Sequence, residues 1–97
     1  MFTSKERSNL RSMAQTLEPI GQVGKGGISD NSVEFISEAL DKRELVKISV
    51  LNNTDDDAKT IADELSRLLK AEVVCVIGHK IVLYRRSNKK GVVHIKY

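Results

Sequence analysis

The spacing of apolar residues changes along this chain between the strand period and the helical period, and these changes limit the folds it can adopt. In residues 45–51 Val46, Ile48 and Val50 alternate with other side chains, as in a partly buried strand. In residues 58–69 apolar residues recur at three- and four-residue intervals, which predicts a helix with a broad apolar face. Strands that alternate with amphipathic helices indicate an α/β domain.

The N-terminal part of the chain extends this alternation. Thr3 and Glu6 have the spacing of a capping box, and the apolar residues after them predict a helix over residues 4–16, which Pro19 stops. Residues 20–23 predict a brief strand. A second helix is expected to begin near residues 29–31, where Ser, Asp and Asn are all suitable N-caps.

The C-terminal part predicts two further strands. Residues 73–77 are apolar on both faces, and a turn at Gly78-His79 leads into residues 81–84, as in a hairpin. The order is then α-β-α-β-α-β-β, and we expect one domain with a mixed four-stranded sheet packed with helices and right-handed parallel crossovers. Its core should span about residues 4–86, followed by a basic segment at 87–97.

Charge is distributed unevenly along the 97 residues. Residues 28–78 carry six bases against eleven acids, whereas residues 79–97 carry six bases and no acid. A polyanion would be attracted if folding placed the basic ends of the chain on one face, although a solvated basic tail can also bind nothing. Charge alone leaves these alternatives open.

The segment Gly24-Lys25-Gly26-Gly27 is the strongest candidate for a phosphate site. Glycines let the backbone approach a ligand closely, and the predicted helix start beyond them would offer unpaired N–H groups to an anion. Lys25 would add a mobile cation. The alternative is that the glycines only form a tight connection between strand and helix. The order is neither that of a dinucleotide fingerprint nor that of a Walker loop.

Together these segments resemble the CRM domain family, and in particular its stand-alone bacterial YhbY-like members, which are small RNA-binding proteins associated with ribosome assembly. The resemblance covers about residues 4–86. It implies an α/β fold in which the GxxG loop at Gly24–Gly27 and a basic surface beside it contact RNA. Family members often have a glycine at the end of the third helix, where this chain has Leu69-Lys70-Ala71. The resembling residues are Leu17–Ile20, Val23–Ile28, Ala39-Leu40, Glu44–Ile48 and Val76–Arg85.

The combined hypothesis is an RNA-binding protein of the cytoplasm that contacts structured ribosomal RNA in a precursor of the large subunit. The ribosomal target follows from the resemblance only. We expect Lys25, Lys80 and Arg85 to assist Gly24, Gly26 and Gly27, with Arg85 on the same surface as the loop. We expect no membrane partner, no small-molecule substrate and no cofactor. The rival hypothesis is a protein-interaction module whose basic ends bind an acidic partner protein.

Enzymatic and metal-binding interpretations have little support in the sequence. Cys75 and His79 are four residues apart on a predicted strand and its turn, where they cannot converge on one metal. A lone cysteine in an apolar run is typical of a reduced core thiol. A nucleic-acid-processing enzyme would need a carboxylate pair or a histidine near the glycines, and Glu18 and Asp30 make no evident pair.

Overall fold

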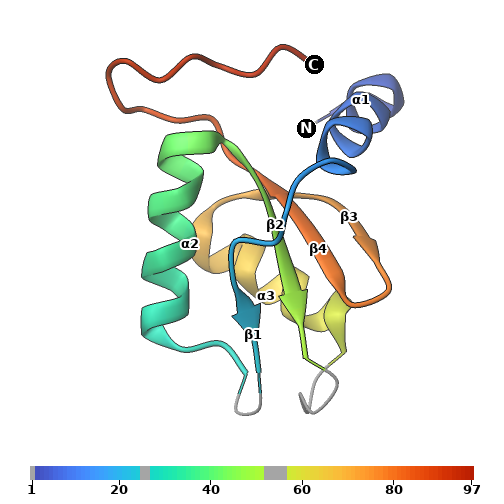
Figure 1. Ribbon diagram of the computed structural model, residues 1–97, viewed down its shortest axis with the longest axis vertical. Coiled ribbons are helices and arrows are strands. Elements are labelled where there is room, and N and C mark those ends of the chain that lie inside the picture. The colour runs from blue at the N-terminus through green and yellow to red at the C-terminus, as the bar shows by residue number, and fades with distance from the viewer. Residues whose placement is uncertain (1, 25–26, 52–56) are drawn as a thin grey trace.

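The computed structural model describes residues 2–24, 27–51 and 57–97 of the chain. It contains the seven elements expected from the sequence, in the expected order (Figure 1). None of the helices in these ranges is long and apolar enough to cross a membrane. The elements are α1 (Ser4–Ala14), β1 (Gln22–Val23), α2 (Asp30–Arg43), β2 (Leu45–Val50), α3 (Ala58–Leu69), β3 (Glu72–Ile77) and β4 (Lys80–Tyr84).

The four strands form one mixed sheet in the order β1-β2-β4-β3. β1 pairs in parallel with β2, whereas β4 lies antiparallel to both β2 and β3. The last strand therefore fills the space between two strands that precede it in the chain. This arrangement confirms the predicted mixed sheet and its terminal hairpin.

Side-chain caps fix the helix starts. The Thr3 hydroxyl accepts a hydrogen bond from the Glu6 amide, and the Glu6 carboxylate accepts one from the Thr3 amide, which confirms the predicted capping box. Ser29 caps α2, and Asp57 caps α3 by accepting from the Thr60 amide at 2.8 Å. Each cap satisfies a backbone N–H that has no partner within its helix.

The two faces of the sheet are covered differently. α2 and α3 pack on one face and bury a large core that includes Ile36, Ile48, Leu65 and Ile81. α1 packs on the other face through Leu10 and Ala14, against a smaller cluster. Figure 1 shows α1 at the end of the sheet away from β1, so that the rest of this face is left without a helix over it.

The Arg7 side chain attaches α1 to the edge strand β3. The register of β3 against β4 shifts between Val73 and Cys75, which is the mark of a bulge. Nη1 of Arg7 donates to the carbonyl oxygens of Val73 and Val74 at this bulge, the second at 2.9 Å. Arg7 is therefore part of the packing of α1 and is not a freely solvated cation.

The lack of a glycine at residues 69–71 places a lysine in an unfavourable backbone conformation at the end of α3. α3 ends at Lys70, which adopts a left-handed backbone conformation with φ 54° and ψ 43°. Glycine is the residue that adopts this conformation without a steric penalty, and other L-residues pay about 1–2 kcal/mol for it. α3 therefore ends in the left-handed conformation that glycine favours, although this chain has Lys70 at that position.

We therefore expect Lys70→Gly to raise the free energy of unfolding by up to about 1 kcal/mol, because the relief of strain exceeds the added flexibility of the unfolded chain. Urea denaturation of the two proteins would measure the difference. A matched Lys59→Gly change inside α3 should instead be destabilising. Equal destabilisation by both changes would contradict this account of the helix end.

Candidate nucleic-acid interface

The glycine segment lies at the end of the sheet where β1 and β2 both finish. Val23 pairs with Val50, and the amide of Leu51 donates to the Val23 carbonyl at 2.8 Å. The amide of Gly27 donates to the Gly24 carbonyl at 3.0 Å, which closes the ends of the segment. Lys25 and Gly26 lie outside the described residues.

Gly24 and Gly27, the two described glycines of the segment, are each favoured over other residues for a different structural reason. Gly27 has φ +75° in open space, so its backbone conformation favours glycine. A Cβ on Gly24 would lie 3.1 Å from Cδ1 of Leu51, so this backbone passes close to a side chain. These requirements agree with the tight-connection alternative.

The start of α2 offers less to an anion than the sequence suggested. The Ser29 side chain already accepts from the amide of Ser32 at 3.1 Å, and Asp30 places a carboxylate in the first turn. A negative side chain at this position competes with a phosphate for the positive end of the helix dipole. The backbone donors beyond the glycines are therefore partly used by the protein itself.

Lys80 lies at the same end of the sheet as the glycine segment. It pairs with Ser49 across β2 and β4, and its Nζ donates to the Ser49 hydroxyl at 2.7 Å. Ser49 in turn pairs with Gln22 of β1. The ammonium group of Lys80 is thus held two strands away from the segment that follows β1.

A small hollow of about 110 Å³ lies between α1 and the strands β2, β3 and β4, and Lys80 is one of the residues that line it. Three cations line it, Arg11 from α1, Lys47 from β2 and Lys80 from β4, and none of the described residues that line it is acidic. We call Arg11, Lys47 and Lys80 the basic sheet face. Lys47 was not singled out from the sequence, although the alternation of β2 places it on the face opposite Val46 and Ile48.

The Cys75 thiol lies in the same hollow and is partly buried. Burial raises the pKa of this thiol, and the nearby charges of Arg11, Lys47 and Arg7 only partly oppose the effect. A thiol with a raised pKa stays protonated at neutral pH and is a poor nucleophile. Cys75 therefore gives the hollow no reactive thiolate at neutral pH.

Arg85 is not on this surface, and the expected proximity to the glycine segment is wrong. It follows the far end of β4, about 17 Å from Lys80 at the rise of a strand. Its guanidinium donates to the Leu69 and Ser37 carbonyls at 2.9 and 2.8 Å and pairs with Asp41 at 3.0 Å. These bonds join the end of β4 to α2 and α3, which is a structural use of the charge.

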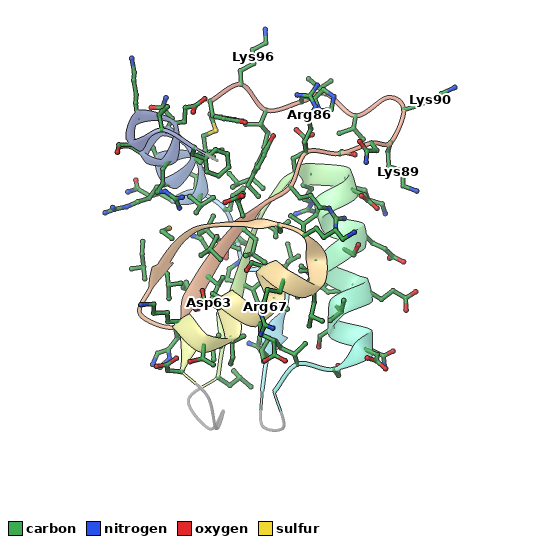
Figure 2. All side chains as sticks on the ribbon, turned by 180° about the vertical axis from the view of Figure 1, so that it is seen from behind. Asp63, Arg67, Arg86, Lys89, Lys90 and Lys96 are labelled. Atoms are coloured by element: carbon green, nitrogen blue, oxygen red, sulfur yellow. The ribbon has the colours of Figure 1, made fainter. Side chains whose placement is uncertain are left out.

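The C-terminal segment also lies at the far end of the sheet. Figure 2 shows Arg86, Lys89, Lys90 and Lys96 spread along it, and Figure 1 places it opposite the glycine segment. The two basic ends of the chain therefore do not form one continuous surface around the glycines.

A buried carboxylate holds this segment in place. Glu44 has no exposed surface and a positive φ of 64°. Its carboxylate accepts hydrogen bonds from the amides of Ser87 and Ile95 at 2.7 and 2.8 Å, and its Oε2 lies 2.6 Å from Nδ1 of His94. Because an ionised carboxylate only accepts, Nδ1 of His94 carries the hydrogen. No feature of the sequence around Glu44 identified this role.

Aromatic packing secures the last residue of the segment. The rings of Phe2, Tyr84 and Tyr97 lie edge to face, with centroids 5.3–5.4 Å apart. Burial, together with the neighbouring Tyr97, raises the pKa of Tyr84 to about 12. Tyr84 is consequently a packing residue and is not available for stacking on a base.

Comparison with known proteins identifies the family of this fold. The model of the CRS1 / YhbY (CRM) domain matches residues 2–85. The chain belongs to the CRM domain family. The matched range is close to the extent of 4–86 expected from the resemblance, and the basic C-terminal segment lies beyond it.

Relatives of this CRM domain are named as RNA-binding proteins. The Probable RNA-binding protein YqeI of Bacillus subtilis is 46% identical over 89 residues, which cover 92% of this chain and 93% of YqeI. An RNA-binding protein of Haemophilus influenzae is 31% identical and is covered over 89% of its length by 91% of this chain. These names describe binding proteins and not enzymes, in agreement with the sequence prediction.

A solved structure has the same fold. The solution structure of the hypothetical protein SAV1595 from Staphylococcus aureus matches with a TM-score of 0.80 and 43% sequence identity. The match covers 99% of this chain and 100% of SAV1595. The α/β architecture is therefore shared over the whole domain.

The Glu44 contacts predict that the C-terminal segment detaches in acid. Burial raises the pKa of the Glu44 carboxyl, but the Ser87 amide, His94 and the Ile95 amide lower it by more, so the net pKa lies below the ordinary value. A group with a lowered folded-state pKa stabilises the fold above its unfolded-state pKa, and this stabilisation is lost as the pH falls through the folded-state value.

Hydrogen exchange measures this directly. We expect the amides of Ser87 and Ile95 to be protected at neutral pH and to lose protection, relative to their intrinsic exchange rates, as the pH falls below the ordinary pKa of a glutamate carboxyl. The Leu83 amide in β4 serves as the internal control and should stay protected longer. Unchanged protection of Ser87 and Ile95 through this range would contradict the role of the carboxylate.

Proposed function

We propose that this CRM domain binds structured RNA through Gly24-Lys25-Gly26-Gly27 and the basic sheet face. The observation that carries the proposal is a hollow between α1 and the sheet that three cations and no acidic described residue line. One of these cations, Lys80, lies at the same end of the sheet as the glycine segment. Cations and backbone N–H groups held together suit the phosphates of an RNA backbone. The names of the relatives support RNA as the partner.

The proposed contact is made mainly to phosphates and to RNA shape. Tyr84 is buried and Phe2 packs against it, so the aromatic platform typical of base-stacking RNA-binding domains is not formed by these residues. Lysine and arginine side chains reach phosphates without distinguishing bases. Such a surface suits a folded RNA whose phosphates are already arranged in space.

Within this proposal Arg85 has a positioning role. Its guanidinium is engaged by Leu69, Ser37 and Asp41 and has 21% exposed side-chain surface, so it fixes α2 and α3 relative to β4. Lys80 and Lys47 replace it as the cations expected at the RNA. The resemblance to YhbY-like proteins extends the proposal to ribosomal RNA in the large-subunit precursor and to action in the cytoplasm.

The basic sheet face is tested by removing two of its cations. We expect Lys47→Ala with Lys80→Ala to weaken binding to a structured ribosomal RNA fragment at least about tenfold, and to reduce the slope of log affinity against log salt by about 2. The reason is that two phosphate contacts and their released counterions are lost. Fluorescence anisotropy across a salt series measures both quantities.

A matched control removes the same charge from the other face of the sheet. Lys59→Ala with Arg67→Ala changes two exposed cations on α3 and should leave the salt slope nearly unchanged. If both double variants lose the same affinity, binding is a diffuse attraction and the proposed interface is wrong. Absence of RNA binding even at low salt would favour the rival hypothesis of an acidic protein partner.

A further inference from the structure

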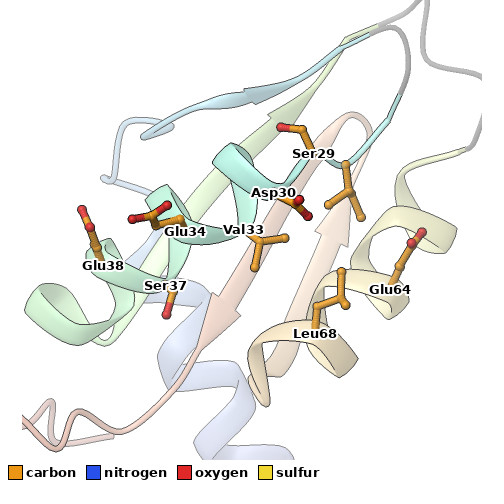
Figure 3. Close-up of a pocket in the computed structure, with 9 residues that line it drawn as sticks. Ser29, Asp30, Val33, Glu34, Ser37, Glu38, Glu64 and Leu68 are labelled. Carbon is orange, nitrogen blue, oxygen red and sulfur yellow. The ribbon is translucent and has the colours of Figure 1, made fainter.

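A second surface lies on the opposite side of the sheet, between α2 and α3. It is a groove of about 520 Å³ whose apolar part is formed by Ile28, Val33 and Leu68 (Figure 3). Leu68 is 54% exposed, although it lies on the most amphipathic helix of the fold. We call this surface the α2–α3 groove.

The rim of the α2–α3 groove is acidic. Asp30, Glu34 and Glu38 follow one another at four-residue intervals along α2, and Glu64 lies across from them on α3 (Figure 3). No described residue that lines the groove carries a positive charge. The ion pairs found among the described residues are Arg85–Asp41 and His94–Glu44, so none of these four carboxylates forms an ion pair with another described residue.

This row of acids works against the stability of α2. Like charges four residues apart on a helix repel one another. The helix dipole favours Asp30 in the first turn, but Glu34 and Glu38 lie beyond its reach. Lys42 lies four residues beyond Glu38 and offsets part of its repulsion, but α2 carries no cation three or four residues from Glu34, where a cationic ligand would relieve the repulsion.

We propose that the α2–α3 groove docks a lysine- or arginine-rich segment of a partner protein. An apolar side chain of that segment packs on Ile28, Val33 and Leu68, while its cations meet Glu34, Glu38 and Glu64. RNA is excluded from this face because its phosphates would meet the carboxylates. A bare metal ion does not fit either, because no group of three or more potential ligands among the described residues converges on one point.

The α2–α3 groove and the proposed RNA interface lie on opposite faces of the sheet, so the domain has room for a second partner besides the RNA. Basic arms are typical of proteins that bind nucleic acid. A CRM domain bound to RNA through its basic sheet face would expose the α2–α3 groove to such arms on proteins assembled on the same RNA. The domain would then join an RNA on one face to a protein on the other.

The test uses a defined probe and no RNA, so that its failure leaves the RNA proposal untouched. The probe is a short fluorescent lysine-rich peptide with a central leucine, compared with the same peptide carrying serine in place of leucine. Glu34→Lys with Glu38→Lys should weaken binding of the leucine peptide by about tenfold or more. Leu68→Asn should weaken the leucine peptide several-fold and leave the serine peptide unchanged, because only the apolar contact is lost.

The matched control places the same charges outside the groove. Asp63→Lys with Glu72→Lys reverses two exposed acids of α3 and β3 and should have little effect on either peptide. Equal losses in the two double variants would overturn the proposal in favour of diffuse attraction. It would also be overturned if sedimentation showed a dimer of this chain that Glu34→Lys with Glu38→Lys dissociates, since the groove would then hold a second copy.

Discussion

The position of β4 between β2 and β3 is the constraint on which the rest of the structure depends. It places Lys80 beside Ser49 at the glycine end of the sheet, and it carries Arg85 to the opposite end. The two faces of this sheet are covered differently: α2 and α3 pack on one, and α1 covers the other only in part. The basic sheet face lies on this second face, where Lys47 and Lys80 of the sheet lie beside Arg11 of α1.

Buried polar contacts explain why the basic C-terminal region is not simply a ligand surface. Glu44 is fully buried, and burying a carboxylate is costly unless hydrogen-bond donors surround it. Ser87, His94 and Ile95 supply those donors, and Arg85 donates to the Leu69 carbonyl at the end of α3 and to the Ser37 carbonyl within α2. These contacts fix the path of the last residues, while Arg86, Lys89, Lys90 and Lys96 remain along the outside (Figure 2).

Local features could be predicted from the sequence, and long-range pairings could not. The capping box of Thr3, the alternation in β2 and the hairpin at Gly78 depend on neighbours within a few residues, and each was confirmed. The partners of Arg85 lie up to 48 residues away, so its charge was interpreted as a ligand contact. Nothing in the local sequence distinguishes Arg85, whose guanidinium is engaged by the protein, from Lys80. The union of Arg11, Lys47 and Lys80 likewise requires the sheet order, which the sequence left open.

The most direct test of the account is to map amide chemical shifts of the labelled protein during titration with a structured ribosomal RNA fragment. We expect the largest chemical-shift changes at the amides of Gly24, Gly27, Lys47 and Lys80. The amides of Glu34, Glu64 and Leu68 should change little. Changes concentrated on the C-terminal segment or along α2 and α3, with the glycine end of the sheet unaffected, would contradict it.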